Sequence, residues 1–355
     1  MKGVRYFTKT QAGIDSVVEE IERQRVLVPF KLNAKTIDFL SISGGGDNGA
    51  FAAGVLNGWS AHGTRPTFNL VTGVSTGALI APFAFLGPEY DATLRDVYTS
   101  ITPERVYTSS GVLSALFGDS YADTSPLYRL ISEHITPEVL KKIAYEYTYN
   151  HRWLIVATTD LDDGMPVAWN MGKIAAYGTT EALTLFRKIL LASASIPAAF
   201  PPVLFEVTLN GEPYQEMHVD GGASSQAFLY APTLQKQVQQ DPRYIKLPRR
   251  VFIIRNSRLE PERVITERRA TSIAARSIGL LIYNQGLGDL YQMYLIAKTD
   301  GLQFNLAYIR RDFDFPHQHE FDTEYVRALY QYGFDQAENG YPWRQAPPGF
   351  DQPGL

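Results

Sequence analysis

A serine framed by glycines is the residue of this chain whose setting best suits chemistry. The segment 73–77 (GVSTG) follows residues 68–72, which predict a short buried strand, and leads into 76–86, an apolar stretch compatible with a helix. A serine on a sharp strand-to-helix turn presents its hydroxyl, and flanking glycines leave room for that turn. The helix N-terminus would also favour negative charge developing near Ser75. The pattern predicts a nucleophile, with a plain glycine-rich turn as the alternative.

A second glycine-rich segment precedes the serine. Residues 36–42 predict a strand, 43–49 (SGGGDNG) follow it, and the small residues of 50–59 predict a helix. Three glycines between a strand and a helix allow backbone N–H groups to converge on an anion, either a nucleotide phosphate or the oxyanion of an acyl-transfer intermediate. The segment does not match a Walker A loop or a dinucleotide-binding loop. The serine turn on the next strand therefore favours the oxyanion.

An aspartate followed by two glycines is the third signal. The segment 219–222 (VDGG) comes after the polar run 215–218. This arrangement suits a loop that offers the carboxylate of Asp220 to the end of a neighbouring strand. Taken alone, this segment is more typical of an ordinary turn.

The three motifs, in this order along the chain, resemble those of the patatin-like phospholipase family. The stretch 193–202 (SASIPAAFPP) also resembles the family's segment before the aspartate, rich in Ser, Ala and Pro. The resemblance covers residues 37–222. It implies a patatin-like fold and a lipid acyl hydrolase, of phospholipase A or lysophospholipase type, that forms an acyl-enzyme. It implies neither a cofactor nor a metal.

The resemblance also gives roles to single residues. Ser75 would attack the ester carbonyl, and Asp220 would take its proton as the general base. The oxyanion hole would be formed by the backbone of Gly44, Gly45, Gly46 and Thr76. The residues that support the motifs would be Asn48, Gly49, Gly73, Gly77, Gly221 and Gly222. The family usually has Arg or Lys at the position of Asn48, so a positive charge is missing from this loop.

A Ser-Asp dyad has to be weighed against a Ser-His-Asp triad. An aspartate near its usual pKa of about 4 is a poor base for a hydroxyl, so burial would have to raise the pKa of Asp220. His317 and His319 come late enough in the chain for a triad, but residues 312–321 predict an exposed polar loop. On an extended segment His218 would face the same way as Asp220, and could line the site without being the base.

The composition is that of a soluble enzyme. The 355 residues are 45% hydrophobic, enough for one large core or two modest ones. No apolar run approaches the roughly twenty residues of a transmembrane helix. Residues 1–7 lack the apolar core of a signal peptide. The chain is therefore expected to be cytoplasmic, or exported with its signal removed, and at most peripheral at membranes.

Charge and cysteine content exclude other classes. The net charge is −4 and no basic tract is long, so nucleic acid is not an expected partner. The absence of cysteine excludes disulfides and thiol catalysis. There is no HExxH motif or calcium-loop pattern, and residues 160–164 (DLDDG) predict a hairpin turn rather than a metal site. The expected partner is a lipid ester at a membrane or micelle surface; the oligomeric state is not predicted.

Strands alternate with helical stretches along the chain. This order predicts a three-layer α/β fold with a mostly parallel central sheet and helices on both faces. Expected helices cover 14–27, 91–107, 126–147 and 181–192, and expected strands cover 152–159, 165–170, 250–256 and 301–309. We expect a single domain over 1–355, with its motif core at about 36–225. Residues 226–340 would complete the fold, and 341–355 would form an irregular tail.

Two segments could contact a lipid. Residues 111–118 form a short apolar run between glycines, which predicts either a flap over the site or a buried helical turn. Residues 271–297 are apolar on one side, with Arg268, Arg269 and Arg276 near their start. For this long segment an ordinary surface helix that covers the core is favoured over a membrane-facing helix.

Two other functions fit the same motifs. An acyltransferase would pass the acyl group from the same acyl-enzyme to an alcohol instead of water. A non-catalytic lipid- or protein-binding module is the alternative of another class. The joint presence of Ser75, Asp220 and the glycine-rich loop argues against it, because a binding module needs none of the three.

Overall fold

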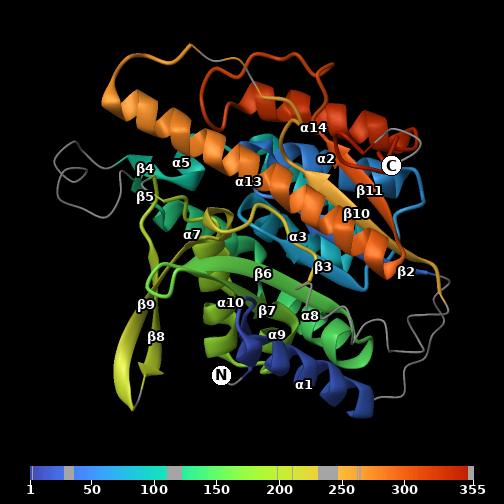
Figure 1. Cartoon of the computed structure of the whole chain (residues 1–355), viewed down its shortest axis with the longest axis vertical. Helices are drawn as coiled ribbons and strands as arrows, with labels where there is room; N and C mark the ends of the chain where they lie inside the picture. The colour runs from blue at the N-terminus through green and yellow to red at the C-terminus, as the bar shows by residue number, and fades with distance from the viewer. Residues whose placement is uncertain are drawn as a thin grey trace.

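A mixed sheet runs through the centre of the molecule, with helices on both of its faces (Figure 1). The computed structural model describes residues 1, 3–27, 36–109, 122–197, 199–209, 211–230, 247–261, 263 and 265–350. The strands of the central sheet in this part of the chain are β1 (Arg5–Phe7), β2 (Ile37–Ile42), β3 (Leu70–Gly73), β6 (Trp153–Asp160), β7 (Met165–Asn170), β8 (Val203–Leu209), β9 (Glu212–Asp220), β10 (Arg249–Arg255) and β11 (Leu302–Tyr308). A separate short pair consists of β4 (Thr108–Ser109) and β5 (Ala122–Asp123).

The strand order explains the class of the fold. Along the sheet the order is β1-β7-β6-β3-β2-β10-β11, and the five strands from β6 to β11 are parallel to one another. The strands β7 and β1 extend one edge in antiparallel fashion, and the hairpin β8–β9 joins β6. The predicted α/β architecture with a mostly parallel sheet is thus confirmed.

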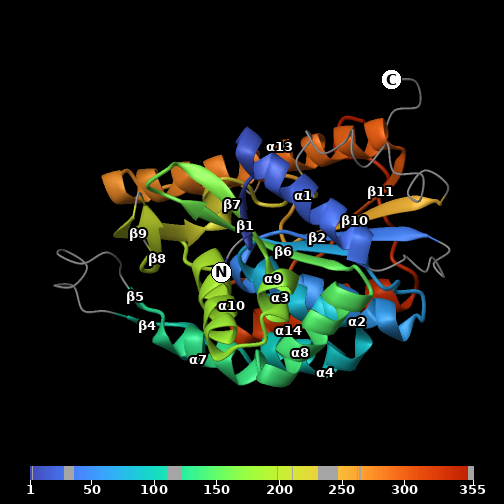
Figure 2. The same ribbon diagram turned by 90° about the horizontal axis from the view of Figure 1, so that it is seen from below.

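The helices form the two outer layers. The longer helices are α1 (Gln11–Leu27), α2 (Gly49–Ala61), α3 (Thr76–Leu86), α4 (Asp91–Ser100), α7 (Ser125–His134), α8 (Pro137–Tyr149), α10 (Thr180–Ser193), α13 (Ala270–Asp300) and α14 (Thr323–Glu338). The short ones are α5 (Pro103–Val106), α9 (Met171–Ala176) and the single turns η1 (Gly46–Asn48), η2 (Pro88–Tyr90) and η3 (Gly221–Ala223). Figure 2 shows α13 and α1 on one face of the sheet and the other long helices on the opposite face.

Alternation of side chains along the parallel strands produces two cores. In β2, Ile37 and Phe39 pack toward α13, whereas Leu40 and Ile42 belong to the larger core on the other face. The strand β10 divides in the same way, with Val251 on the α13 side. Because both faces are covered, these strands carry apolar residues on both sides, as expected of parallel strands in a three-layer fold.

Two long helices expected from the sequence are each broken by a proline. The expected helix 91–107 is interrupted after α4 and resumes at Pro103 as α5. The expected helix 126–147 divides into α7 and α8, where Thr136 is extended and its side chain accepts a hydrogen bond from the N–H of Val139. A residue before proline disfavours the helical conformation, while proline itself suits a first helical position. The sequence pattern predicted the helical segments correctly but was wrong in joining them into two continuous helices.

The polar run 215–218, before the Asp-Gly-Gly motif, belongs to β9, which ends at Asp220 and pairs with β8 along its length. This strand was not predicted, because polar residues on an exposed hairpin strand do not show the alternation that identifies a half-buried strand.

The long helix α13 covers the sheet only with its second half. Leu290, Met293 and Ala297 are buried in the core beneath it, whereas the apolar side chains of its first half are exposed. The expectation of a core-covering surface helix therefore holds for half of its length. Within the described chain, no helix combines the length and apolar character needed to cross a membrane.

The remaining segments can be placed briefly. The possible flap at 111–118 lies outside the described residues. The tail residues 341–350 lack regular helix or strand apart from one bridge to β11, as expected, yet Tyr341 is buried and Trp343 packs against Trp59.

Candidate active site

Ser75 occupies a strained turn between β3 and α3. Its backbone has φ 57° and ψ −128°, a combination that residues with a side chain rarely adopt. A Cβ atom at Gly77 would lie 2.2 Å from the carbonyl oxygen of Ile42, so only glycine allows the turn to pack against β2. The strained conformation and the close packing agree with the turn that the sequence predicts.

A second serine holds this turn in place. The N–H of Ser75 donates to Oγ of Ser193 at 3.0 Å, and this hydroxyl donates to the carbonyl oxygen of Ala157 in β6 at 2.7 Å. Ser193 thereby ties the turn to the neighbouring strand. The sequence placed Ser193 in the stretch that resembles the family, but its role depends on a contact across the fold.

Asp220 reaches Ser75 because two strands share one edge of β6. The strand β3 pairs with the first part of β6 and ends with Gly73 opposite Val156. The strand β9 approaches from the opposite direction along the same edge and ends with Asp220 opposite Thr158. The ends of β3 and β9 therefore meet, and the Ser75 side chain comes close enough to the Asp220 carboxylate to influence its pKa.

The surroundings of Asp220 make it an unusually basic carboxylate. Its side chain is buried, and burial raises its pKa to about 7. Two interactions oppose this rise: one with the Ser75 side chain and a hydrogen bond from the N–H of Gly222, which lies 2.7 Å from Oδ1. The burial needed for a Ser-Asp dyad is thus present.

The glycine-rich loop is clamped by Asn256, which follows β10. The backbone N–H of Asn256 donates to Oγ of Ser43 at 2.9 Å, and its side-chain amide donates to the carbonyl oxygen of Ser43 at 2.9 Å. A Cβ atom at Gly45 would lie 2.4 Å from the carbonyl oxygen of Asn256. A side chain at position 45 would therefore displace the loop. The contact of Asn256 with this loop could not be predicted from the sequence, because Asn256 lies far from the loop along the chain.

The hydrogen bonds of this loop narrow the set of oxyanion donors. The N–H of Gly44 donates to the carbonyl oxygen of Gln226 at 3.0 Å, so it is already engaged. Among the described residues, no acceptor lies within hydrogen-bonding reach of the N–H groups of Gly45, Gly46 and Thr76. The expected role of Gly44 as a donor therefore does not fit this geometry, whereas the other three groups remain available.

An apolar cavity of about 820 Å³, partly open to solvent, reaches the Ser75 turn. Gly46, Ser75 and Thr76 form part of its wall. The rest is mostly aliphatic and aromatic, and includes Leu79, Leu94, Val97, Leu127, Ile131, Leu190 and Phe200. Ser75 is therefore buried in the protein and forms part of the wall of this apolar cavity.

The histidines considered for a triad lie elsewhere. His317 is in an exposed loop as expected, but its Nε2 lies 2.8 Å from Oδ2 of Asp47 and its ring stacks on Tyr325. His319 contacts the carbonyl oxygen of Glu320. In the described structure neither histidine contacts Asp220. His317 instead stabilises the glycine-rich loop through its contact with Asp47.

Asn48 takes part in the same stabilisation. Its Oδ1 accepts a hydrogen bond from the Tyr325 hydroxyl at 2.7 Å, at the N-terminus of α2. The residue that replaces the family's basic side chain thus connects the loop to α14.

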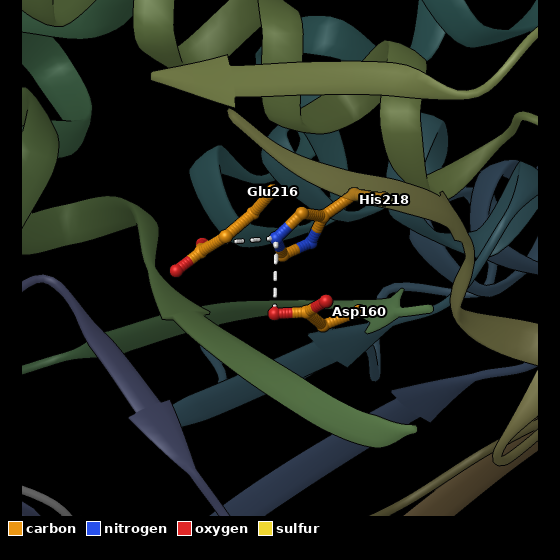
Figure 3. Close-up of side chains that lie close together, drawn as sticks. All are labelled: Asp160, Glu216 and His218. Atoms are coloured by element: carbon orange, nitrogen blue, oxygen red, sulfur yellow. Dashed lines mark hydrogen bonds and ion pairs between the residues drawn. The ribbon is translucent and has the colours of Figure 1, made fainter. Parts of the chain in front are cut away.

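His218 belongs to a separate buried cluster with Asp160 and Glu216, in which the three side chains point toward one another (Figure 3). The Nε2 atom of His218 lies 3.4 Å from Glu216 and 3.8 Å from Asp160, and its Nδ1 lies 2.9 Å from Oγ1 of Thr158. Burial lowers the pKa of His218. The side chain does not line the cavity at Ser75, so the suggestion that it lines the site is wrong.

This cluster has a donor set that could hold a divalent cation, because one imidazole and two carboxylates are common zinc ligands. Arg5 already forms an ion pair with Glu216 and supplies positive charge there. Asp160 also accepts hydrogen bonds from the N–H groups of Asp162 and Asp163, which confirms the hairpin turn predicted for 160–164. The chemistry proposed below uses no metal.

The fold and the site together define a class. A mostly parallel sheet carries a serine on a strained strand-to-helix turn, with a buried aspartate and a glycine-rich loop beside it; this is the arrangement of α/β proteins built for acyl chemistry. The family model described as patatin-like phospholipase matches residues 40–231, and the chain belongs to this family.

Solved structures of low identity resemble this fold. VipD from Legionella pneumophila is 10% identical, with 87% of this chain and 67% of VipD covered and a TM-score of 0.41. Full-length ExoU from Pseudomonas aeruginosa, solved in complex with full-length SpcU, is 12% identical. In that case 86% of this chain and 52% of ExoU are covered, with a TM-score of 0.37, so the chain spans about half the length of ExoU. No curated protein matches the chain significantly by sequence.

Proposed function

We propose that this protein is a lipid acyl hydrolase that uses Ser75 as nucleophile and Asp220 as general base. The observation that carries the proposal is the position of the Ser75 side chain beside a buried carboxylate whose pKa is raised to about 7, at the wall of an apolar cavity. A base with a pKa near the working pH is effective in removing a proton and in returning it. Membership of the patatin-like phospholipase family supports a lipid ester as the substrate.

The geometry supports a two-step reaction through an acyl-enzyme. As Ser75 Oγ attacks the ester carbonyl, its proton passes to Asp220, and a tetrahedral intermediate forms. Collapse of this intermediate breaks the ester bond, and Asp220 returns the proton to the departing alcohol. Water then attacks the acyl-enzyme while Asp220 again accepts a proton. The bond between the acyl group and Ser75 Oγ breaks, Asp220 returns the proton to Ser75 Oγ, and the fatty acid is released.

The backbone supplies the stabilisation of negative charge. The N–H groups of Gly45, Gly46 and Thr76 are the proposed donors, and Thr76 begins α3, so that the helix dipole adds to their effect. One such donor typically contributes about 2.7–4 kcal/mol to transition-state stabilisation. Because Asn256 and Ser193 hold the loop and the turn, these donors are positioned before substrate binds.

The cavity favours a hydrocarbon chain as the acyl group. Its wall is formed by α3, α4, α7 and α10, and its side chains offer few hydrogen bonds to a polar substrate. Apolar burial contributes roughly 0.8 kcal/mol for each methylene group. We infer that the acyl chain lies in this cavity while the alcohol portion leaves through the open side.

Product analysis tests the proposed activity. The purified protein, incubated with a panel of phospholipids, lysophospholipids and neutral acylglycerols, is expected to release free fatty acid, detected by mass spectrometry. Added short-chain alcohols reveal any transfer, because an acyltransferase would produce new esters in place of fatty acid. Absence of both products with every lipid class would contradict the proposal.

The pH dependence follows from the raised pKa of Asp220. The base form is required, and it is lost as the pH falls through the folded-state pKa of about 7. We therefore expect kcat/KM on a soluble ester to fall by about tenfold per pH unit below pH 7. An aspartate with its usual pKa would keep full activity down to a pH of about 5. A profile that stays flat from pH 8 to pH 5 would show that Asp220 is not the base.

A further inference from the structure

The first half of α13 exposes apolar side chains that no described residue covers. The exposed fractions are 52% for Ile273, 53% for Ile278 and 70% for Leu281. Leu280, Ile282 and, just before the helix, Ile265 are also exposed. We call these six residues the α13 patch. Large apolar side chains exposed in this number on one stretch of helix mark a candidate interaction site.

The patch projects from the edge of the sheet where the candidate site lies. The helix joins the parallel strands β10 and β11, so it runs against their direction and its N-terminal end extends beyond their carboxyl ends. Figures 1 and 2 both show this end reaching past the strands. Ser75 and the glycine-rich loop follow the carboxyl ends of β3 and β2 at the same edge.

Direct contacts connect α13 to the candidate site just beyond the patch. Oδ2 of Asp289 accepts the N–H of Gln226 at 2.6 Å, and the carbonyl oxygen of Gln226 accepts the N–H of Gly44. The Tyr283 hydroxyl donates to the carbonyl oxygen of Leu259 at 2.7 Å. The helix is therefore anchored where the patch ends, and the patch has a fixed position relative to the site.

The charge around the α13 patch indicates which partner binds there. Residues 263–285 contain four arginines, Arg263, Arg268, Arg269 and Arg276, and a single acid, Glu267. The chain as a whole carries −4, so this segment is basic within an acidic protein. Exposed apolar side chains beside arginines suit the interface of a membrane that contains anionic lipid; one of these arginines, Arg269, also lies 3.5 Å from Glu267. A second copy of this acidic chain would match the apolar residues but would leave the arginines facing other arginines.

We propose that the α13 patch is the surface by which this protein docks on anionic phospholipid membranes. Docking here inserts the apolar residues among the acyl chains and sets the arginines against lipid phosphates. It also holds the carboxyl edge of the sheet, and with it Ser75, toward the membrane. The proposal rests on the proposed function only for the biological role of docking, since membrane binding itself can be measured without hydrolysis.

A flotation experiment tests the docking surface. The full chain carrying Ser75→Ala, which leaves the lipid intact, is mixed with vesicles of phosphatidylcholine and phosphatidylserine in a ratio of about 7:3, and with phosphatidylcholine alone. We expect binding to the anionic vesicles that weakens as salt is raised, because the ionic contribution is screened. Added Leu281→Asp should reduce vesicle affinity by at least about tenfold, since it removes an inserted side chain and adds a charge that anionic lipid repels.

Leu295→Asp provides the matched control. Leu295 is an equally exposed leucine of α13, at 59%, but it lies on the half that packs on the sheet. Its substitution should leave vesicle affinity within about twofold. With Ser75 intact, both variants should hydrolyse a soluble ester like the parent, and only Leu281→Asp should lose activity on anionic vesicles. Arg268→Gln with Arg269→Gln should weaken binding to anionic vesicles specifically.

Three results would overturn the proposal. Leu281→Asp could bind as tightly as the parent, the parent could bind neither kind of vesicle, or the parent could form a dimer in solution that Leu281→Asp dissociates. The soluble-ester assay separates these results from a failure of the proposed function. If the protein with Ser75 intact did not hydrolyse the ester, the dyad would be contradicted, and the vesicle measurement with the Ser75→Ala protein would be unaffected.

Discussion

Ser75→Ala is expected to reduce acyl hydrolysis by at least about 10⁴-fold, because the proposed acyl-enzyme forms on the Ser75 hydroxyl. The substitution removes a single oxygen atom and leaves the strained backbone of the turn unchanged, so the fold should persist. Rates with a soluble ester and with phospholipid measure the loss. Intact-mass analysis after treatment with a fluorophosphonate should show one covalent adduct on the parent and none on the variant.

Ser224→Ala is the matched control for this substitution. Ser224 lies close to Asp220 in the chain, and its hydroxyl contacts Thr159 rather than the cavity. It should keep activity and labelling within a few-fold of the parent. If Ser75→Ala retained activity near that of Ser224→Ala, or if the fluorophosphonate labelled another serine, the nucleophile would have been assigned wrongly.

Asp220→Asn is expected to reduce turnover by about 10³-fold or more, since the amide cannot accept the proton of Ser75 at any pH. The replacement has the same shape, and its amide oxygen can still accept the N–H of Gly222, so the loss should be chemical rather than structural. The reaction of Ser75 with the fluorophosphonate should slow in parallel. The acid limb of the pH profile near pH 7 should disappear from whatever activity remains.

Histidine variants separate the dyad from a triad. His319→Ala changes an exposed side chain and should leave kcat unchanged. His317→Ala removes the partner of Asp47 and should cost at most a few-fold, because it only braces the glycine-rich loop. Loss of turnover in either histidine variant, together with active Asp220→Asn, would establish a histidine as the base.

The local parts of the site could be predicted from the sequence because each is encoded within a few consecutive residues. The turn at Ser75 follows from the glycines at 73 and 77, and the loop at 44–46 from its run of glycines. The alternation of strands and helices identified the class of fold for the same reason, since hydrophobic periodicity is a short-range property. The prediction of helices failed only where a proline interrupts a long helical pattern, as Pro137 does.

Contacts between distant segments could not be predicted in this way. Gln226 engages the N–H of Gly44 and Asn256 holds Ser43, and both residues reach the glycine-rich loop from another part of the chain. Likewise, the sequence suggested that His317 lies in a plain exposed loop, whereas the fold brings it onto Asp47.

The sequence by itself determined the motifs, the class of fold and the two residues proposed for chemistry. Only the tertiary structure decided that Asp220 is buried with a raised pKa, that Gly44 is engaged, that Ser75 opens onto an apolar cavity, and that half of α13 stands uncovered. The physical reason is that burial, desolvation and hydrogen-bond competition are set by neighbours in space. Those neighbours are fixed when β3 and β9 meet on one edge of β6.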